Sequence, residues 1–434
     1  MSHGSTPDRT IGATGISRVE GEGSLRIQVH DNQVTDVALE IFEPPRYFEA
    51  LLVGRHFSEA PDITARICGI CPVAYQMTAC AAMEDVCGVN VSDQISALRR
   101  LLYCGEWIQS HALHVYLLHA PDFLGCADAV ELAERDRRTV ERGLDLKRTG
   151  NLIMATVGGR AVHPVNVRVG GFYRAPDREA VAALAEPLRR ARDAALATVS
   201  WVSGFDFPDV TGEYRFVALH DPDRYAIDRG RPRSSDGLDV APAEFADLVR
   251  EEHVARSTAL HARLNGVGHY LTGPLARFAL NAAALPPLAA EAASGAGLTA
   301  PCRNPFQSIV VRAVELVFAC DEALRLVEGY EPPEPPAFEV RARAGVGTGV
   351  TEAPRGLLFH QYEIDDDGII RRARIVPPTS QNQLTIEDDL RRVAQGGLSL
   401  DDHALQWRCE QAVRNHDPCI SCAAHFLDLS VVRT

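Results

Sequence analysis

Two CxxC pairs lie at opposite ends of this 434-residue chain, and they constrain its fold more than any other feature. The first is in RICGICP, at Cys68 and Cys71, and the second is in DPCISCAAH, at Cys419 and Cys422. Two cysteines at this spacing can reach one metal ion, and clustered thiolates select soft or borderline metals. The two pairs are therefore either unrelated, or the fold brings both ends of the chain together around one metal site.

Spacing alone leaves three explanations open for the thiol pairs. A structural zinc site is the commonest use of paired CxxC motifs, but its two halves usually lie tens of residues apart. A single pair could also be a redox dithiol. The third explanation is a composite site shared by both pairs, since sulfur donors select zinc, iron–sulfur clusters, or nickel and iron. The other cysteines are too irregularly spaced for a disulfide framework, and we expect buried apolar roles for Cys80, Cys87, Cys104, Cys126, Cys302, Cys320 and Cys409.

Charge and hydropathy exclude several classes of protein. The net charge of −14 disfavours nucleic acid or an anionic membrane as the main partner. No apolar run approaches the roughly 18 residues of a membrane span. The beginning of the chain, MSHGSTPDRTIGATG, has no apolar segment typical of a secretory signal. We therefore expect a cytoplasmic protein with reduced thiols and no membrane span.

The hydrophobic patterns predict an α+β fold that is mainly helical, with small β elements at both ends. Two β-hairpins are expected, over residues 24–43 and 357–376. Helices are predicted over residues 95–122, 177–202, 306–330, 388–397 and 401–416, and Pro187 favours a kink in the second. The Pro-rich residues 331–338 form the clearest linker. We expect this linker to cross the surface of one unit, so residues 1–425 are predicted to be a single composite domain.

The residues around the cysteines extend both pairs into longer motifs, R-I-C-G-I-C-P and D-P-C-x-x-C-x-x-H. Together with RVEG, SHALHVYLLHAPD, TEAPRG and PTSQN, they resemble the large subunit of nickel–iron hydrogenases over roughly residues 14–425. The resemblance is weakest in the middle. It implies a long central helix bundle in which the two CxxC segments meet at a buried metal site. It also implies reversible, heterolytic cleavage of dihydrogen to protons and electrons.

The same resemblance assigns the metal ligands. Cys68 and Cys419 would be terminal nickel ligands, and Cys71 and Cys422 would bridge nickel to an iron that also carries carbon monoxide and two cyanides. Glu49 and His425 would bind a magnesium ion. Carboxylate and water suit magnesium, whereas histidine is a less usual ligand for it. Without the family, Glu49 would be taken for a solvated helix residue.

The resemblance also implies residues that handle protons and anionic ligands. The Cys419 thiolate would accept the proton, and Glu20 would relay it as a general acid–base group, with Glu22 as a nearby competitor. Arg355, preceded by Pro354, would lie over the open metal position and the cyanides.

Several further positions have two possible interpretations. Thr379 would donate a hydrogen bond to a cyanide, with Ser380 as the neighbouring alternative. Asp122 would lie near Arg355, although an aspartate at this position is more often a helix cap. His111 and His114, three residues apart on one helical face, are either core residues or hydrogen-bond donors beside the centre.

One departure from the family indicates a subgroup. Many relatives carry a histidine four residues after the first pair, where this chain has Tyr75 in CPVAYQ. CPVAYQ and PTSQN look like the cytoplasmic NAD(P)-linked branch, the sulfhydrogenases, which implies a sulfur reductase side activity. No GxGxxG follows a strand and too few cysteines remain for further clusters. Partners would therefore supply these groups: an iron–sulfur small subunit and flavin- and NAD(P)-binding diaphorase subunits.

Alternatives to this function belong to other classes. The homologous metal-free subunit of respiratory complex I lacks the four cysteines. A dihydrogen sensor usually has no tail after the terminal histidine, whereas residues 426–434 follow His425 here. Two further alternatives are a hydrogenase coupled to a deazaflavin coenzyme and a structural protein stabilised by bound zinc. In the family, a maturation chaperone assists metal insertion and an endopeptidase trims the tail, so FLDLSVVRT is expected to be a maturation peptide.

Overall fold

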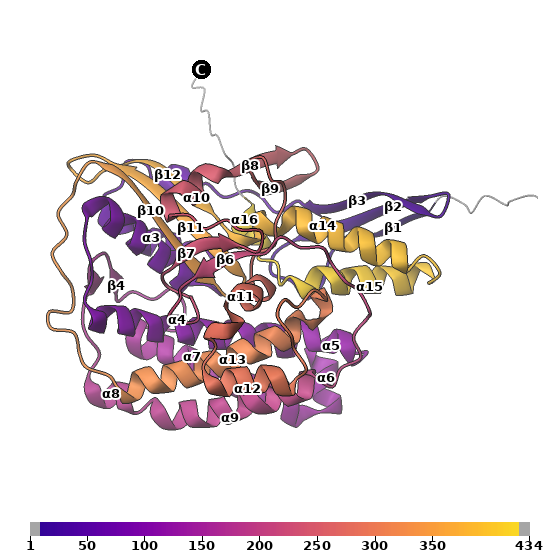
Figure 1. Cartoon of the computed structure of the whole chain (residues 1–434), viewed down its shortest axis with the longest axis horizontal. Coiled ribbons are helices and arrows are strands. Elements are labelled where there is room, and N and C mark those ends of the chain that lie inside the picture. The colour runs from indigo at the N-terminus through magenta and orange to yellow at the C-terminus, as the bar shows by residue number, and fades with distance from the viewer. Residues whose placement is uncertain (1–8, 425–434) are drawn as a thin grey trace, which may run out of the picture.

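Four long helices pack into a bundle in the computed structural model, which describes residues 9–424; the bundle lies in the lower half of Figure 1. They are α4 (Asp93–Leu113), α7 (Arg137–Gly158), α9 (Ala185–Val202) and α13 (Ser308–Glu328). Helix α4 packs on α7 and α13, and α13 also packs on α9. The crossing of α4 and α7 is close because two glycines face each other there. A Cβ atom on Gly150 would lie 2.5 Å from the carbonyl oxygen of Gly105. The predicted central helix bundle is therefore confirmed.

The long helices begin and end largely where the sequence predicts. The side chain of Ser92 caps α4 by accepting the N–H of Ile95. Beyond Leu113 the chain continues through a π-helical segment, His114–His119, into α5 (Ala120–Phe123). In the predicted helix 177–202, a break separates α8 (Arg178–Ala182) from α9. Pro187 lies in the first turn of α9, where no backbone N–H is needed, so it causes no kink.

Two three-stranded antiparallel sheets contain the predicted hairpins. The first joins β1 (Arg9–Ala13), β2 (Gly23–His30) and β3 (Gln33–Ile41), in that order. The second joins β10 (Gly345–Ala353), β11 (Gly356–Ile364) and β12 (Ile370–Val376). Strands β1 and β10 were not predicted, because neither stretch shows the apolar alternation of the hairpins beside it.

The expectation that β structure occurs only at the chain ends was incomplete. Three two-stranded sheets lie between the large ones: β4 (Val167–Arg168) with β5 (Gly171–Phe172), β6 (Val217–His220) with β7 (Arg231–Ser234), and β8 (Val249–Val254) with β9 (Ser257–Leu264). The Pro-rich linker crosses the surface as expected, because Phe338 N–H donates to the Gly170 carbonyl and Phe172 N–H donates to the Pro336 carbonyl.

The remaining helices surround the bundle and the sheets. They are α1 (Phe48–Leu52), α2 (Ala60–Thr64), α3 (Pro72–Cys87), α6 (Ala129–Arg135), α10 (Pro242–Leu248), α11 (Pro274–Asn281), α12 (Pro287–Gly295), α14 (Pro378–Gly396), α15 (Asp402–Asn415) and α16 (Ile420–Ala423). Helix α14 begins ten residues before the predicted position because PTSQN forms its first turn. Within residues 9–424, no helix is both long and apolar enough to cross a membrane.

The last described helix, α16, and the residue that follows it contact two segments near the beginning of the chain. Ile420 N–H donates to the Glu20 carbonyl at 3.0 Å, and Arg46 N–H donates to the Ala424 carbonyl at 3.0 Å. The closing segment is therefore held by main-chain hydrogen bonds to residues near the beginning of the chain. His425 and the predicted peptide 426–434 lie outside the described residues.

Acid should destabilise this fold partly through His360 of β11. Burial lowers the pKa of His360 to about 3, whereas an unfolded chain binds this proton near pH 6.5. The contribution of His360 to stability is therefore present above pH 6.5 and is lost as the pH falls towards 3, at up to about 1.4 kcal/mol per pH unit. We expect the melting temperature to fall less between pH 7 and pH 5 in His360→Gln than in the unsubstituted chain. His30 is exposed, so the melting temperature of His30→Gln should fall as much as that of the unsubstituted chain. An equal fall in melting temperature for all three proteins would contradict the assignment to His360.

Candidate metal centre

The four cysteines of the two CxxC pairs meet in the protein interior. Their sulfur atoms all lie within 4.8 Å of one another, and all four residues are buried. The sulfur atoms of Cys68 and Cys419 are 3.6 Å apart although 351 positions separate them in the sequence. The prediction that both ends of the chain build one site is confirmed, and the alternative of two unrelated pairs is wrong.

The first pair is placed by the start of helix α3. Cys68 follows a short 3-10 turn, and Cys71 is the N-cap residue of α3, with Pro72 in the first helical position. The N–H groups of Ile70 and Cys71 point to the sulfur of Cys68 at 3.3 and 3.4 Å. Hydrogen bonds of this kind stabilise a thiolate.

Helix α4 holds this loop from both sides, which the sequence analysis missed. The carboxylate of Glu106 accepts the N–H groups of Val73 at 2.6 Å and Ala74 at 3.1 Å. One turn further on, Gln109 donates from its side-chain amide to the Ile70 carbonyl. Burial raises the pKa of Glu106, and the two N–H donors oppose that rise. A charged residue within an otherwise buried apolar helix was the signal that could have revealed this contact.

The second pair is held by α14 and by the segment that carries Glu20. Cys419 N–H donates to Thr379 Oγ1 at 2.9 Å. Glu20 pairs with Cys419 as a parallel bridge, and its carboxylate accepts the N–H of Ser421 at 3.2 Å. Gly21 permits this approach, because its φ is +91° and a Cβ there would lie 2.6 Å from the side chain of Ile420. The structure thus brings Glu20 to the second pair, whereas Glu22 is exposed.

A second carboxylate, Glu43, also reaches this segment and was not predicted. The Ser421 hydroxyl donates to Glu43 Oε2 at 2.9 Å. Ser421 therefore contacts both carboxylates, Glu20 through its N–H and Glu43 through its hydroxyl. Both carboxylates are half-buried, so they lie between the buried thiols and the solvent.

Arg355 lies in the two-residue turn between β10 and β11, directly after Pro354. Its Nε donates to the Asp417 carbonyl at 2.8 Å, and its Nη2 contacts Asp417 Oδ1 at 3.2 Å. Asp417 has a φ of +51°, a conformation that aspartate tolerates better than most residues. Pro354 contributes its carbonyl, which accepts a hydrogen bond from buried Arg277.

The guanidinium of Arg355 has one buried nitrogen, Nη1, without a hydrogen-bond partner among residues 9–424. Burial opposes the charge of Arg355, but Asp417 and then the thiols of Cys419, Cys71 and Cys68 outweigh it and hold the pKa well above its usual value. The Arg355 cation therefore faces the sulfur cluster, and its Nη1 can still donate a hydrogen bond.

Asp122, which was predicted to lie near Arg355, has other arginines as its hydrogen-bond partners. Asp122 does not pair with Arg355; its carboxylate accepts hydrogen bonds from Arg414 at 2.7 and 2.8 Å and from Arg18 at 2.6 Å. Asp417 takes the expected place beside Arg355. Asp122 instead ties α5 to α15 and to the N-terminal segment, because two arginines from distant parts of the chain reach one buried carboxylate.

These contacts predict a structural effect for Asp122→Asn. Removing the charge leaves Arg18 without its counterion and buried Arg414 with only Glu410, at 3.4 Å, and breaking a buried pair in this way costs about 3–5 kcal/mol. We therefore expect a melting temperature many degrees below that of the unsubstituted protein. Asp402→Asn is the matched control, since Asp402 pairs with Arg9 at the surface and such pairs contribute about 0–1 kcal/mol. Similar melting temperatures for the two variants would contradict this role of Asp122.

The two histidines of α4 and its extension contact core groups. His111 Nε2 lies 3.0 Å from Glu315 Oε2, and His114 Nε2 lies 2.8 Å from the Arg414 carbonyl. Burial lowers the pKa of both side chains. These contacts favour the core interpretation. Ser380, the alternative to Thr379, has a buried hydroxyl without a partner in the described part of the chain.

The thiols form one coupled, buried set. Hydrogen bonds from Cys419, Cys422 and Cys71 lower the pKa of Cys68 well below its usual value. Burial raises the pKa of Cys419 and Cys422. Four thiolates could not remain together in this interior without cations, because unpaired buried charge is costly. Metal binding removes the protons and supplies that positive charge.

The residues present fit a nickel–iron centre. Four convergent sulfur donors suit soft or borderline metals, and a nearby cation with an unpartnered N–H suits anionic ligands on such a centre. Zinc coordination by the same cysteines would leave Arg355 Nη1 without a partner. The donor set therefore favours a larger group than one zinc ion.

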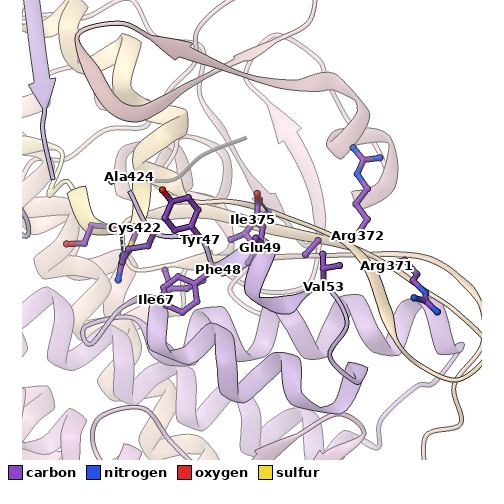
Figure 2. Close-up of a pocket in the computed structure, with 14 residues that line it drawn as sticks. Tyr47, Phe48, Glu49, Val53, Ile67, Arg371, Arg372, Ile375, Cys422 and Ala424 are labelled. Carbon is purple, nitrogen blue, oxygen red and sulfur yellow. Dashed lines mark hydrogen bonds between the residues drawn. The ribbon is translucent and has the colours of Figure 1, made fainter. Parts of the chain in front are cut away.

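A cavity of about 210 Å³ lies next to Cys422 (Figure 2). Glu49, Ile375 and Ala424 line it together with Cys422. Glu49 Oε1 accepts the N–H of Ile375 at 2.6 Å, which fixes the carboxylate at the cavity wall. Ala424 is the last described residue. A carboxylate at the wall of a cavity large enough for water is compatible with a hydrated magnesium ion.

Comparisons with known proteins agree with this centre. The model of the family described as nickel-dependent hydrogenase matches residues 46–142, which contain the first CxxC pair. Sulfhydrogenase 1 subunit alpha of Pyrococcus furiosus is 33% identical over 418 residues, covering 95% of this chain and 97% of the relative. The structure of an NAD⁺-reducing [NiFe]-hydrogenase in the H₂-reduced state aligns with a TM-score of 0.85 at 28% identity, covering 97% of this chain and all of that chain.

Fold, cysteine cluster and relatives together define the class: the chain belongs to the nickel-dependent hydrogenases, as the large, catalytic subunit. It is an oxidoreductase acting on dihydrogen. Within this family it is similar to the sulfhydrogenase alpha subunits; that of P. furiosus sulfhydrogenase 2 is 32% identical over 95% of this chain and 98% of the relative. The NAD-reducing hydrogenase HoxS subunit beta of Cupriavidus necator is 26% identical over 95% of this chain and 94% of the relative.

Proposed function

We propose that this subunit cleaves and forms dihydrogen reversibly and exchanges the electrons with NAD(P) through partner subunits. The four-sulfur cluster beside Arg355 is the observation that carries the proposal. Nickel would be held terminally by Cys68 and Cys419 and share Cys71 and Cys422 with iron. Carbon monoxide and two cyanides would complete the coordination of the iron. When bound, this centre supplies the redox chemistry that takes up electrons from dihydrogen.

The protein's own groups handle the proton. Cys419 would accept it, and Glu20, which pairs with the Cys419 backbone, would carry it away from the sulfur. The contact of Glu20 with the Ser421 N–H holds the carboxylate in place during this transfer. The Ser421 hydroxyl and Glu43 would continue the route towards solvent, since Glu43 is the next carboxylate contacting the same segment.

Arg355 would stabilise negative charge on the centre. Its Nε and Nη2 are fixed by Asp417, so Nη1 can donate to a cyanide without reorganisation of the side chain. A Thr379 hydroxyl that accepts the Cys419 N–H still has its own proton to donate, and the Ser380 hydroxyl is a second donor for a cyanide. Glu49 and His425 would hold magnesium at the cavity of Figure 2.

The coupling to NAD(P) is proposed from the similarity to sulfhydrogenase alpha subunits and to NAD-reducing hydrogenases. An iron–sulfur small subunit and flavin- and NAD(P)-binding diaphorase subunits would carry the electrons. The cytoplasm is the proposed location, and sulfur reduction the proposed side activity. A maturation chaperone and an endopeptidase would act on the chain, with cleavage after His425 removing residues 426–434. Intact mass of nickel-loaded subunit still ending at Thr434 would contradict this cleavage.

One preparation tests the central proposal. The subunit is purified with its natural partners, nickel and iron are quantified, and the infrared spectrum is recorded. Nickel, iron in excess of nickel because the partner subunits carry iron–sulfur clusters, bands from carbon monoxide and two cyanides, and dihydrogen-dependent NAD(P) reduction are expected. Zinc alone, or no diatomic ligand bands, would overturn it. Bands with dihydrogen oxidation but no NAD(P) reduction would overturn only the proposed electron acceptor.

A further inference from the structure

Arg277 is a fully buried arginine that lies behind the turn carrying Arg355. It belongs to the first turn of α11 and is 0% exposed. Its Nη1 donates to the Ala353 carbonyl at 3.0 Å, and its Nη2 donates to the Pro354 carbonyl at 2.8 Å. These are the two residues directly before Arg355 in the chain. The Arg277 side chain therefore fixes the backbone from which the Arg355 side chain extends.

Two carboxylates accept the remaining hydrogen bonds of Arg277. Glu315 of α13 accepts from Nε and Nη2, both at 2.7 Å, and Glu352 accepts from Nη1 at 3.0 Å. Together with the two carbonyls, five acceptor atoms meet the five N–H donors of one guanidinium. Lysine has three donors on a single nitrogen and cannot reach five acceptors arranged around a plane. The position therefore requires arginine for its geometry as well as for its charge.

Helix α4 also contacts this group, through Trp107. The guanidinium carbon of Arg277 lies 4.4 Å from the centre of the Trp107 ring, and Trp107 Nε1 donates to the Glu352 carbonyl at 3.1 Å. Burial opposes the charge of Glu315, but Arg277 outweighs it and lowers the pKa of Glu315 to about 2. Burial raises the pKa of Glu352 to about 7, so Glu315 is the permanent counterion. The stacked ring and this counterion hold the planar guanidinium of Arg277 in one orientation.

The segment before Arg277 contacts the same turn from another side. A Cβ atom on Gly273, whose φ is +112°, would lie 2.7 Å from the Arg355 carbonyl oxygen. Thr272 Oγ1 accepts the N–H of Leu357 at 2.7 Å. This segment thus contacts the backbone at and after Arg355, whereas Arg277 contacts the backbone before it.

We propose that Arg277 is a positioning residue that holds the Pro354 carbonyl, so that Arg355 presents Nη1 to the anionic ligands of the metal centre. The proposal rests on the proposed nickel–iron centre, because those ligands belong to it. Asp417 fixes the far end of the Arg355 side chain and Arg277 fixes its backbone, so the direction of Nη1 depends on both contacts. A preorganised donor acts within a narrow range of positions, and a misplacement of about 1 Å can lower the rate about a hundredfold.

The test compares Arg277→Lys with the unsubstituted enzyme, both loaded with metal and bound to their partner subunits. We expect unchanged nickel and iron contents and a dihydrogen turnover about tenfold to a hundredfold lower. The cyanide bands in the infrared spectrum should shift in the same direction as in Arg355→Lys, because both variants weaken the same hydrogen bond. Combining the two substitutions should lower turnover no further than Arg355→Lys alone, since Arg277 acts through Arg355.

Arg99→Lys is the matched control for this substitution. Arg99 is a buried arginine of α4 that donates to both carboxylate oxygens of Glu84, at 2.9 and 2.7 Å. Its acceptors, Glu84 and the Arg168 carbonyl, lie outside the turn that carries Arg355. Arg99→Lys should therefore leave the cyanide bands and the turnover in place.

Unchanged cyanide bands in metal-loaded Arg277→Lys would overturn the proposal. A double variant whose loss of turnover equals the product of the two single losses would also overturn it. If Arg277→Lys does not load metal, Trp107→Phe takes its place, since it keeps an aromatic face for the guanidinium but loses the donor to the Glu352 carbonyl. Unchanged cyanide bands in Trp107→Phe would then overturn the proposal.

Failure of the nickel–iron centre would give a different result. Absence of all diatomic bands from the unsubstituted enzyme would contradict that centre. Hydrogen exchange in the same complex tests Arg277 independently of the metals. The amides of residues 353–357 should exchange faster in Arg277→Lys than in Arg99→Lys, and equal rates would overturn the role of Arg277.

Discussion

Replacing Cys419 by alanine should abolish both nickel binding and dihydrogen turnover. Cys419 is one of four sulfurs within 4.8 Å of one another, and its backbone N–H is fixed by Thr379. Its removal leaves three thiols and takes away both a nickel ligand and the proposed proton acceptor. We expect nickel, measured by mass spectrometry of the purified complex, to fall to background, and dihydrogen-dependent activity to disappear with it.

The control for this substitution is Cys80→Ala. Cys80 is a buried thiol on the helix that begins after Cys71, and burial raises its pKa to about 12. It lies outside the sulfur cluster, so this variant should keep its nickel and its activity at a small cost in stability. Full nickel content in Cys419→Ala, or equal loss in both variants, would exclude Cys419 as a ligand.

Glu20→Gln should separate proton transfer from metal binding. Glutamine keeps an oxygen to accept the Ser421 N–H but cannot carry a proton at neutral pH. Removing a positioned general acid–base group lowers turnover by about a hundredfold or more. We therefore expect dihydrogen oxidation to fall by at least that factor, while nickel, iron and the infrared bands are unchanged.

Glu22→Gln is the matched control for Glu20→Gln. Glu22 lies two residues further along the same segment, but it is exposed, and only its backbone N–H contacts Glu43. Its substitution should leave turnover unchanged. Unchanged turnover in Glu20→Gln would contradict the role of Glu20 as the proton relay. If turnover fell in Glu22→Gln and not in Glu20→Gln, Glu22 would be the relay.

The sequence predicted the elements of this site that depend on motif and periodicity. CxxC spacing located the thiols, the apolar repeats located α4 and α13, and the register of RVEG placed Glu20 rather than Glu22 beside the second pair. Each of these features is either a short motif or the apolar repeat of a single helix, so it can be seen in a short stretch of sequence. The meeting of the two pairs followed from the family resemblance and not from spacing.

Contacts between distant elements could not be predicted in this way. Asp417, rather than Asp122, pairs with Arg355 because a turn between two strands happens to face a residue with positive φ. Glu106 and Gln109 hold the first CxxC loop only because α4 crosses the start of α3. A short stretch of sequence shows that a charged residue lies within a helix, but it does not show which backbone groups that residue contacts. The sequence also could not show that Thr379 accepts the Cys419 N–H while the Ser380 hydroxyl has no partner within residues 9–424.

The wide separation of the two cysteine pairs has a consequence for synthesis of the protein. Translation proceeds at about 5–20 residues per second, so the 351 positions from Cys68 to Cys419 take about 20–70 s to make. During that time the first pair is made without the second pair, so its thiols cannot yet share a metal site with Cys419 and Cys422. A chain that stops early, or is read out of frame, lacks half of the sulfur donors however well its helices fold. The four-sulfur site can therefore form only after translation has passed Cys422.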